Sequence, residues 1–413
     1  MSSPVSVGII GAGYWGTKLI GEYLSAQQKA GNVRLVKVCD VSLSRLLACE
    51  EKFSLHYGTF TQKFEEVMEN PKISAVHIAA PNQTHYALTK MALEAGKDVL
   101  VEKPMTLSSR EAYELVDLAS AKGRVLHVGH IFRYNSALHS ACQLLQEKRL
   151  GRVFYVRIQW TDQAFFPDRD IIFDLGPHPV DVLNQLLQDW PAQVSGFARG
   201  YRGEGDKEEV AYGIAEFHDH AFAHIELSWL HPKKVREVTV VGSEATLLVD
   251  CLDQKVIIVN QQGREEFPVT ANNTIEAEIN HFINRVLRRE TSAESGMIGA
   301  QTVEVLETIR SSMWSRPTPP PRKLRIEPEE DIITILEKVS TLGTRNFFAD
   351  ADDATNGTMK RYLGILYRAG LLRANQTAQG VKYEATEAGA QFLKEYQELM
   401  SASKGEKVKA QHV

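Results

Sequence analysis

The chain has 413 residues, of which 43% are hydrophobic and 24% charged. This composition excludes a mainly disordered chain, a collagen-like fibre and a disulfide-framed mini-protein. At roughly 150 residues per domain, the length predicts two or three domains. The formal net charge of -5 excludes a global positive field that would draw the whole molecule to nucleic acid, so any DNA contact needs a local basic patch.

The cysteines and the N-terminus indicate a cytoplasmic protein. The 4 cysteines lie far apart, without a Cys-x-x-Cys pair, which argues against a zinc site, and we expect no metal. Their scarcity suits a reducing compartment. The first residues show neither the basic region nor the cleavable apolar stretch of a signal peptide. No run approaches the ~18 apolar residues of a membrane span, so we expect no membrane partner.

Residues 1–130 alternate short apolar runs with helical patterns. This alternation predicts a parallel sheet with right-handed helical crossovers, in an α/β domain of the Rossmann type. The expected strands are residues 5–10, 35–39, 73–79, 98–101 and 125–128, and the expected helices include 14–30 and 85–95.

Residues 131–316 have a different pattern, because strand-like runs follow one another through turns. We expect a second domain of the α+β class with an open, mainly antiparallel sheet. Its expected strands are residues 153–160, 194–199, 211–217, 223–229, 237–241, 245–249 and 255–259, followed by helices near 275–288 and 299–312.

The proline-rich segment 317–325 cannot continue a helix and predicts an extended linker. A small third domain is expected at residues 326–400, before a polar tail at 401–413. Its expected elements are helices at 329–339, 345–349 and 355–369, a hairpin around residues 375–380 and a last helix at 387–400.

The motif GAGYWG at residues 11–16 directly follows the first strand and opens a helix. In this context Gly11 allows a tight turn, Gly13 lets a pyrophosphate approach the backbone, and Gly16 lets helix and strand close up. The helix N-terminus offers its free N–H groups to the phosphates. Asp40 ends the next strand, where it can accept hydrogen bonds from ribose hydroxyls and repel a 2′-phosphate, so NAD is favoured over NADP. The alternative is a glycine-rich turn without a ligand.

Two further groups of polar residues follow strands at the same predicted sheet edge, where open α/β sheets bind ligands. The first contains Pro81, Asn82 and His85, and the second contains Glu102 and Lys103. A desolvated lysine beside a positive nicotinamide ring has its ammonium form disfavoured. It could then exchange a proton with a substrate hydroxyl, whereas the alternative for an isolated lysine is a solvated surface residue.

The stretch DLGPHPVD at residues 174–181 places Asp174 just before a helix and His178 within it. His178 and Asp181 are three residues apart and share a helix face. A histidine oriented by Asp174 is a suitable proton acceptor for an alcohol being oxidised. The alternative is a helix-capping aspartate with a locally packed histidine.

Taken in order, the motifs GAGYWG, AAPNQTH, VEKP and DLGPHPVD resemble the glucose–fructose oxidoreductase, inositol dehydrogenase and rhizopine-catabolism family (Gfo/Idh/MocA) over about residues 4–315. The resemblance implies hydride transfer between a nicotinamide and a sugar or cyclitol carbon, with Lys103, Asp174 and His178 as the catalytic set. It also implies a Lys103–Pro104 bond that is often cis, and an open second sheet that often forms an oligomer interface. The expected coenzyme contacts are Gly11, Gly13, Tyr14, Trp15, Gly16, Asp40, Arg45, Pro81, Asn82, His85, Glu102 and Lys103.

The stretches at residues 129–135 and 228–236 are similar to members that act on nucleotide-linked sugars, such as UDP-N-acetylglucosamine or its uronate oxidised at C3. Arg133 and Lys233 could meet a carboxylate or a diphosphate; the alternative is that Lys233 is only a turn charge. The expected substrate contacts are Arg133, Tyr134, Asn135, Asp181 and Lys233.

The third domain resembles a winged helix-turn-helix, a fold that binds DNA in some proteins and other proteins in others. Over residues 324–413 we count 12 Lys+Arg against 13 Asp+Glu, so only a local patch could contact phosphates. An NAD- or metabolite-sensing transcriptional regulator built on the oxidoreductase fold is therefore the alternative to an NAD-dependent sugar dehydrogenase. The possible DNA contacts are Lys360, Arg361, Arg368, Arg373 and Lys382.

Overall fold

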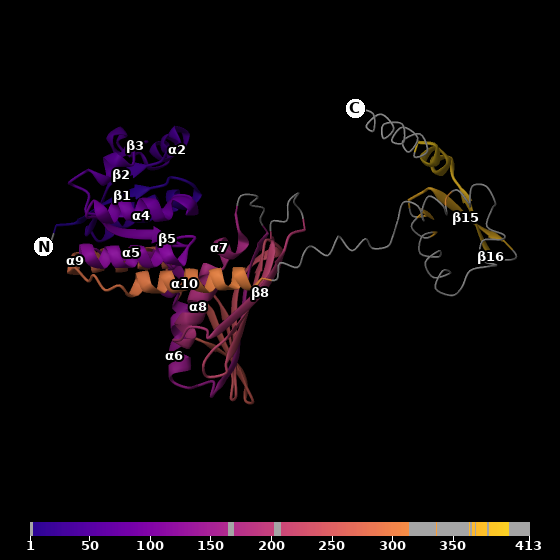
Figure 1. Cartoon of the computed structure of the whole chain (residues 1–413). Helices are drawn as coiled ribbons and strands as arrows, with labels where there is room; N and C mark the ends of the chain where they lie inside the picture. The colour runs from indigo at the N-terminus through magenta and orange to yellow at the C-terminus, as the bar shows by residue number, and fades with distance from the viewer. Residues whose placement is uncertain are drawn as a thin grey trace, which may run out of the picture. The chain divides into compact units, whose positions relative to one another are not determined.

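The computed structural model describes residues 3–163, 169–201 and 208–313, and in the C-terminal part residues 336, 363, 366, 367, 369–377 and 380–395. The chain forms two compact units, Met1–Trp314 and Ser315–Val413, which are coloured along the chain in Figure 1. Within the described ranges, no helix has both the length and the apolar character needed to cross a bilayer.

The first sheet has six strands in the order β3-β2-β1-β4-β5-β6, and all its pairings are parallel. This order is that of the Rossmann fold, whose strands are covered by helices on both faces and are therefore apolar along their length. The predicted parallel sheet is confirmed. Its strands are β1 (Val5–Ile10), β2 (Val33–Cys39), β3 (Phe60–Thr61), β4 (Ala75–Ile78), β5 (Asp98–Glu102) and β6 (Leu126–Gly129).

Helices cover both faces of this sheet. Tyr23 of α1 packs with Val7 and Ile9 of β1 in one core cluster, while Leu115 of α5 packs with Val99 of β5 in the other. The helical segments between the strands are α1 (Tyr14–Lys29), α2 (Leu43–Phe53), η1 (Tyr57–Thr59), α3 (Glu65–Met68), η2 (Asn82–Thr84), α4 (His85–Glu94) and α5 (Ser109–Lys122).

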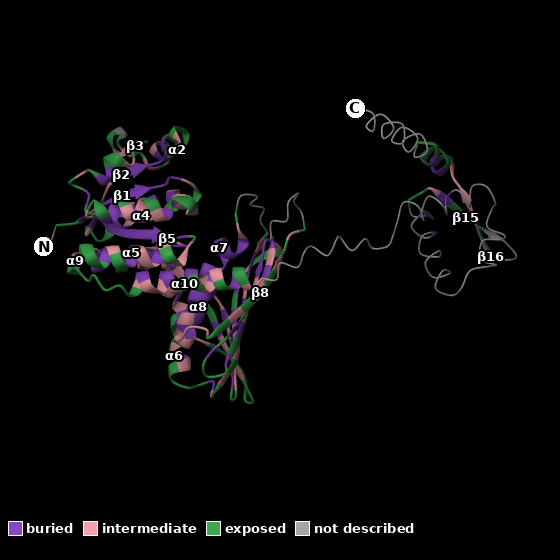
Figure 2. Cartoon of the chain, viewed as in Figure 1, coloured by how far each residue is buried: buried purple, intermediate pink, exposed green. Residues whose placement is uncertain are grey.

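The second sheet has eight strands in the order β14-β13-β12-β11-β7-β10-β9-β8. Only the pair β7–β10 is parallel, so the predicted mainly antiparallel sheet is confirmed. One face packs on helices around the fully buried Trp160, and buried and exposed positions alternate along its strands (Figure 2). The strands are β7 (Val153–Gln163), β8 (Gln193–Arg199), β9 (Val210–Glu216), β10 (Phe222–Ser228), β11 (Leu230–Gly242), β12 (Thr246–Asp250), β13 (Lys255–Asn260) and β14 (Gly263–Phe267), and the preceding or covering segments are η3 (Ile131–Tyr134), α6 (Ser136–Gln146), α7 (Ile171–Leu175) and α8 (Pro177–Leu187).

Two helices that follow the second sheet in sequence return to the first one. Phe282 of α9 (Thr274–Arg288) lies in the same core cluster as Ile9 of β1. In α10 (Glu294–Ser312), Ala300 belongs to a core cluster of the first sheet, whereas Leu306 belongs to the core of the second. Helix α10 therefore runs from beside α5 toward β8 (Figure 1) and connects the two sheets.

The described residues of the C-terminal unit include an antiparallel hairpin of β15 (Leu372–Thr377) and β16 (Gly380–Ala385). This confirms the hairpin predicted there, and residues 387–395 are helical. The linker 317–325, the tail 401–413 and most of the three helices expected between residues 329 and 369 lie outside the described residues. The winged-helix assignment therefore stays a prediction.

Candidate active site

The first glycine turn is closely packed at two of its three glycines. Gly11 has a φ of +104°, and a Cβ there would lie 2.3 Å from the carbonyl oxygen of Ala79. A Cβ on Gly16 would lie 2.0 Å from the oxygen of Gly11, whereas a Cβ on Gly13 would meet nothing within 4 Å. The helix is therefore held against the strand, and the backbone at Gly13 remains open to a ligand at the N-terminus of α1.

Asp40 at the end of β2 supports this turn. Its Oδ2 accepts a hydrogen bond of 2.8 Å from the backbone N–H of Ala12, and its Oδ1 accepts one of 2.8 Å from Ser42. The guanidinium of Arg45 lies 3.6 Å from Asp40 Oδ2 and is more than half exposed. The carboxylate of Asp40 and the guanidinium of Arg45 thus lie together at the end of β2, where a Rossmann fold binds the ribose of a dinucleotide.

The side chains of Trp15 and Glu102 join the glycine turn to the end of β5. The indole N–H of Trp15 donates to Glu102 Oε1 at 2.6 Å, and His77 Nε2 lies 3.3 Å from the same oxygen. Burial alone would raise the pKa of Glu102, but the hydrogen bond and charge of His77 and the Trp15 bond bring it below its ordinary value. The hydrogen bonds to Glu102 thus stabilise its carboxylate form inside the fold. Tyr14 is exposed, with Lys18 Nζ 4.5 Å from the centroid of its ring.

His85 has a structural position. Its ring is buried, with nitrogens 2.9 Å from the oxygen of Ala80 and 2.7 Å from that of Pro104. It thus fixes the loops after β4 and β5, while Pro81 is exposed and Asn82 begins η2. Both polar atoms of the His85 ring face backbone carbonyls, and its assignment as a coenzyme contact stays a prediction.

Lys103 reaches from the first sheet to the helices of the second. The Lys103–Pro104 bond is cis, as the resemblance implies, and Lys103 Nζ donates to the backbone oxygen of Asp174 in α7 at 2.7 Å. Burial lowers the pKa of Lys103, while the charges of Asp174 and Glu102 act in the opposite direction. The lysine is therefore held between the two sheets, where burial makes its ammonium form less stable than it is in water.

Asp174 and His178 form no hydrogen bond with each other among the described residues. Asp174 Oδ1 accepts a hydrogen bond of 3.0 Å from Arg169, while His178 Nδ1 is buried and has no partner among the described residues. The helix breaks at Gly176 between α7 and α8, so the two side chains do not share one regular helix face. Burial lowers the pKa of His178 well below its ordinary value, and the charge of Lys103 lowers it further.

Most of the expected substrate contacts belong to an internal network. Arg133 Nε donates to Asp181 Oδ1 at 2.5 Å, and Tyr134 Oη lies 3.1 Å from His127 Nε2. Asn135 caps α6 and donates to the backbone oxygen of Cys251 at 2.9 Å. The side-chain amide of Asn135 is thus engaged inside the fold, and its role as a substrate contact stays a prediction. Lys233 is exposed on β11.

Two polar residues at the site were missed by the sequence analysis. Arg236 is buried over the ring of Trp160, with its guanidinium carbon 5.2 Å from the ring centroid, and burial lowers its pKa to about 10. The sequence signal for Arg236 was its position two residues before Val238 and four before Val240, which places it on the same inward-facing side of the strand. His130 is buried directly after β6, and its signal was a histidine at the end of an apolar strand.

Most of the possible DNA contacts lie outside the part of the chain that the structure describes. Lys360, Arg361 and Arg368 lie outside the described residues, and the side chain of Lys382 does as well. Arg373 pairs with Glu384 across the hairpin at 3.0 Å. Arg373 is the one predicted DNA contact whose side chain is described, and the carboxylate of Glu384 is already its partner.

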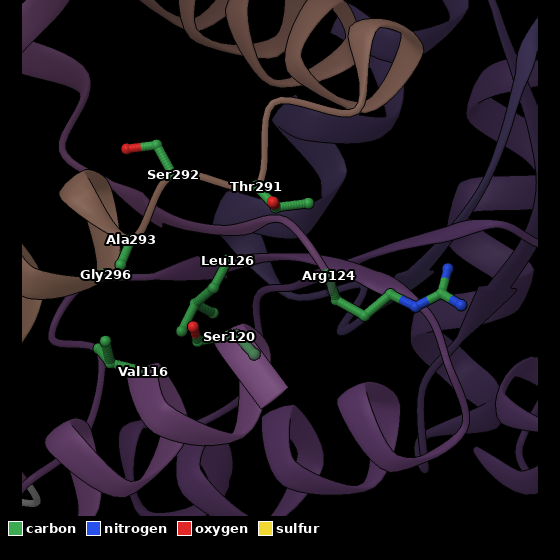
Figure 3. A pocket seen from close by; sticks show the side chains of 9 residues that line it. Val116, Ser120, Arg124, Leu126, Thr291, Ser292, Ala293 and Gly296 are labelled. Carbon is green, nitrogen blue, oxygen red and sulfur yellow. The ribbon is translucent and has the colours of Figure 1, made fainter. Parts of the chain in front are cut away.

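A small pocket between α5, β6 and the start of α10 is separate from these residues (Figure 3). It contains no residue of the predicted site. Its lining residues are Val116, Ala119, Ser120, Arg124, Leu126, Thr291, Ser292, Ala293 and Gly296.

Known proteins similar to the chain include several oxidoreductases. The UDP-N-acetylglucosamine 3-dehydrogenase of Acidithiobacillus ferrooxidans is 26% identical over 316 residues, which cover 73% of this chain and 95% of that protein. The scyllo-inositol 2-dehydrogenase (NAD(+)) of Bacillus subtilis is 27% identical over 259 residues, 58% of this chain and 75% of that one. The uncharacterized oxidoreductase YdgJ of Escherichia coli is 35% identical over 194 residues, but only 44% of this chain and 53% of that protein are covered.

The solved structures agree on the fold. The crystal structure of the Acidithiobacillus ferrooxidans enzyme superposes with a TM-score of 0.64 at 23% identity, covering 75% of this chain and 98% of that one. Residues 5–130 match the oxidoreductase family with an NAD-binding Rossmann fold, and residues 138–248 match the GFO/IDH/MocA C-terminal domain. The chain therefore belongs to the Gfo/Idh/MocA family of oxidoreductases, whose two characteristic domains are the two sheets described above.

Proposed function

We propose that the protein is an NAD-dependent dehydrogenase that transfers a hydride between a nicotinamide and a carbinol carbon of a sugar. The observation that carries this proposal is the position of Lys103, whose Nζ lies 2.7 Å from the backbone of Asp174. Lys103 follows a strand of the first sheet, and Asp174 belongs to a helix that packs on the second. A substrate between the sheets would therefore meet the carboxyl edge where open α/β folds bind ligands.

The residues of the first turn fit a dinucleotide. The space at Gly13 is open, while Gly11 and Gly16 hold the strand and helix close together. The free N–H groups at the start of α1 would bind the pyrophosphate, and Asp40 would accept hydrogen bonds from ribose hydroxyls. When bound, the coenzyme supplies the carbon that accepts or donates the hydride. We favour NAD over NADP because a 2′-phosphate would approach the Asp40 carboxylate.

Lys103 and His178 have different proposed roles toward the substrate. Lys103 with its lowered pKa would take the hydroxyl proton during oxidation and return it during reduction. His178 is held by ring contacts to Phe132 and Trp160, with centroids 4.9 and 6.0 Å away. Its unpartnered Nδ1 would hold a substrate hydroxyl in place.

A nucleotide-linked sugar, such as UDP-N-acetylglucosamine or its uronate oxidised at C3, is the substrate that we favour. The similarity to an enzyme named for this substrate supports the choice. The cations of β11 also support it, because Lys233 and Lys234 are exposed and Arg236 is buried just after them. Together they would attract a diphosphate or a carboxylate.

We also propose that the protein assembles with copies of itself through the open face of the second sheet. Phe197, Ile214 and Phe222 are exposed there, and Phe222 stacks on Tyr155 with centroids 5.8 Å apart. Contiguous apolar side chains on one sheet face are typical of an interaction surface.

Lys103→Ala tests the proposed function. We expect the wild-type protein to reduce NAD with a nucleotide sugar from a panel that also contains inositols and aldoses, followed by NADH absorbance. The substitution removes the group that exchanges the proton, so kcat should fall by about 100- to 10,000-fold. Parallel assays with NADP test the coenzyme preference.

The control for this assay is Lys122→Ala, at the exposed end of α5. It should leave turnover unchanged. The absence of turnover with every compound, or a Lys103→Ala variant as active as wild type, would contradict the proposal.

A further inference from the structure

His130 is placed beside Lys103 by the register of the first sheet. Gly129 of β6 pairs with Glu102 of β5. His130 and Lys103 are the residues that directly follow this pair, one after each strand. The imidazole is 3% exposed, and neither of its nitrogens has a hydrogen-bond partner among the described residues. Because buried polar groups are nearly always bonded, each of these two nitrogens calls for a partner.

One such partner faces the ring from α8. Asp181 is fully buried, and while its Oδ1 accepts from Arg133, its Oδ2 has no hydrogen bond in the described part of the chain. His130 Nδ1 and Asp181 Oδ2 lie 3.6 Å apart. This separation is just beyond hydrogen-bond distance, and in a hydrogen bond between the two atoms the carboxylate accepts and Nδ1 is the donor. The second nitrogen, Nε2, is then left as an acceptor.

His130 therefore has the carboxylate partner that His178 lacks. Burial lowers the pKa of His130, but the charge of Asp181 raises it again. At His178, burial also lowers the pKa, and the charges of Lys103 and His130 lower it further. An acceptor works best when its pKa is near the working pH, so His130 is the better of the two imidazoles for holding a proton.

We propose that His130, oriented by Asp181, takes up the proton that Lys103 receives from the substrate hydroxyl. This proposal rests on the proposed function. During oxidation the carbinol C–H bond breaks and its hydride passes to NAD⁺. The O–H proton passes to Lys103 Nζ and then to His130 Nε2, which leaves a carbonyl group on the sugar. The imidazolium is stabilised by Asp181 until the proton leaves to solvent, and reduction uses the same steps in reverse.

Charged and titratable groups reach His130 from each neighbouring element. The carboxylates of Asp181 and Glu102 favour its protonated form, whereas Arg133 and Lys103 oppose it. Loss of the Asp181 charge should therefore lower the pH at which His130 titrates. Among the described residues, these groups are Asp181 and His178 on α8, Arg133 on η3, Glu102 and Lys103 at the end of β5, and His127 on β6.

The pairing is tested by nitrogen NMR of the full chain with labelled histidine and bound NAD⁺. The His130 signals are identified by their loss in His130→Gln. We expect Nδ1 to be protonated and Nε2 unprotonated at neutral pH, and the titration midpoint to move to lower pH in Asp181→Asn. An unprotonated Nδ1, or the same midpoint in both proteins, would overturn the proposal. If His130→Gln does not fold, His130→Asn identifies the signals.

The relay is tested by the pH profile of kcat. We expect His130→Gln to lower kcat by about 100-fold and to flatten the acid limb, with NADH affinity unchanged. The matched control is His218→Gln, which breaks an exposed pair with Asp189 at 3.2 Å and should change neither property. A His130→Gln variant with wild-type kcat and pH profile would overturn the relay. If the wild-type protein oxidises no compound of the panel, the proposed function and the relay both fail, whereas the NMR experiment still decides the pairing.

Discussion

Gly16 and Gly13 of the first turn have different roles, because we expect Gly16 to be needed for folding and Gly13 for coenzyme binding. A Cβ on Gly16 would press on the oxygen of Gly11 at 2.0 Å, whereas a Cβ on Gly13 would enter open space. We expect Gly16→Ala to lower the free energy of unfolding by about 2–3 kcal/mol. Gly13→Ala should leave it unchanged but weaken NADH binding, because the methyl group occupies the approach of the pyrophosphate. Thermal unfolding and NADH fluorescence measure the two effects, and NADH binding to Gly13→Ala at wild-type affinity would exclude this turn as the coenzyme site.

Individual residues were predictable where the chemistry is local to a few neighbours in sequence. Gly11 and Lys103 could be placed in the fold because a turn or a strand end directly determines their position, although their roles stay predictions. The lack of a hydrogen bond between Asp174 and His178 was not predictable, because it depends on the break between α7 and α8 and on Arg169. The proximity of His130 and Asp181 depends on packing between elements far apart in sequence, which spacing does not encode.

Helix α9 contains a buried acid that should make folding stability pH-dependent. Glu278 is fully buried, and neither of its carboxylate oxygens has a partner among the described residues. Burial raises the pKa of Glu278 well above its ordinary value, and Glu102 and Asp181 raise it further. The folded state then keeps a proton that the unfolded state has lost. Stability should therefore be full below the ordinary carboxyl pKa and fall as the pH rises toward the folded-state pKa, by about 1.4 kcal/mol per pH unit.

Glu278→Gln removes this titration while keeping the shape of the side chain. Urea unfolding at a series of pH values should show that the decline is smaller in the variant than in wild type. Glu276→Gln on the same helix is the control, since the partly exposed Glu276 pairs with the exposed Lys29. Equal slopes for wild type and Glu278→Gln would mean that the carboxyl ionises normally inside the fold.

The elements themselves were predicted best where burial produces a clear pattern. Strands β12 and β13 alternate buried and partly exposed residues, and this period of two is visible in the sequence. Strand β14 was missed because it lies at the sheet edge, exposed along most of its length, with Arg264, Glu265 and Glu266 in succession. Such charged edge strands protect a sheet from unwanted pairing, but they have no hydrophobic signal.

At the scale of the whole molecule, the open face of the second sheet makes the proposed self-association testable. Ile214→Lys combined with Phe222→Lys places two charges on this face, and burying them between copies would be costly. We expect analytical ultracentrifugation to show a smaller species than for wild type. Met91→Lys is the control, because Met91 is an exposed apolar residue on α4. A double variant that sediments like wild type would place the interface elsewhere.

The return of α9 and α10 to the first sheet has a consequence for biosynthesis. Ile279, Phe282, Ile283 and Val286 of α9 complete a core whose other buried residues come from the N-terminal part of the chain. While the ribosome is still making the second sheet, this side of the first sheet lacks its cover and exposes apolar surface. The nascent N-terminal segment should therefore need the later helices, or a chaperone in their place, before it becomes stable. For the same reason, a fragment of the chain that is expressed only as far as the end of the first sheet should aggregate.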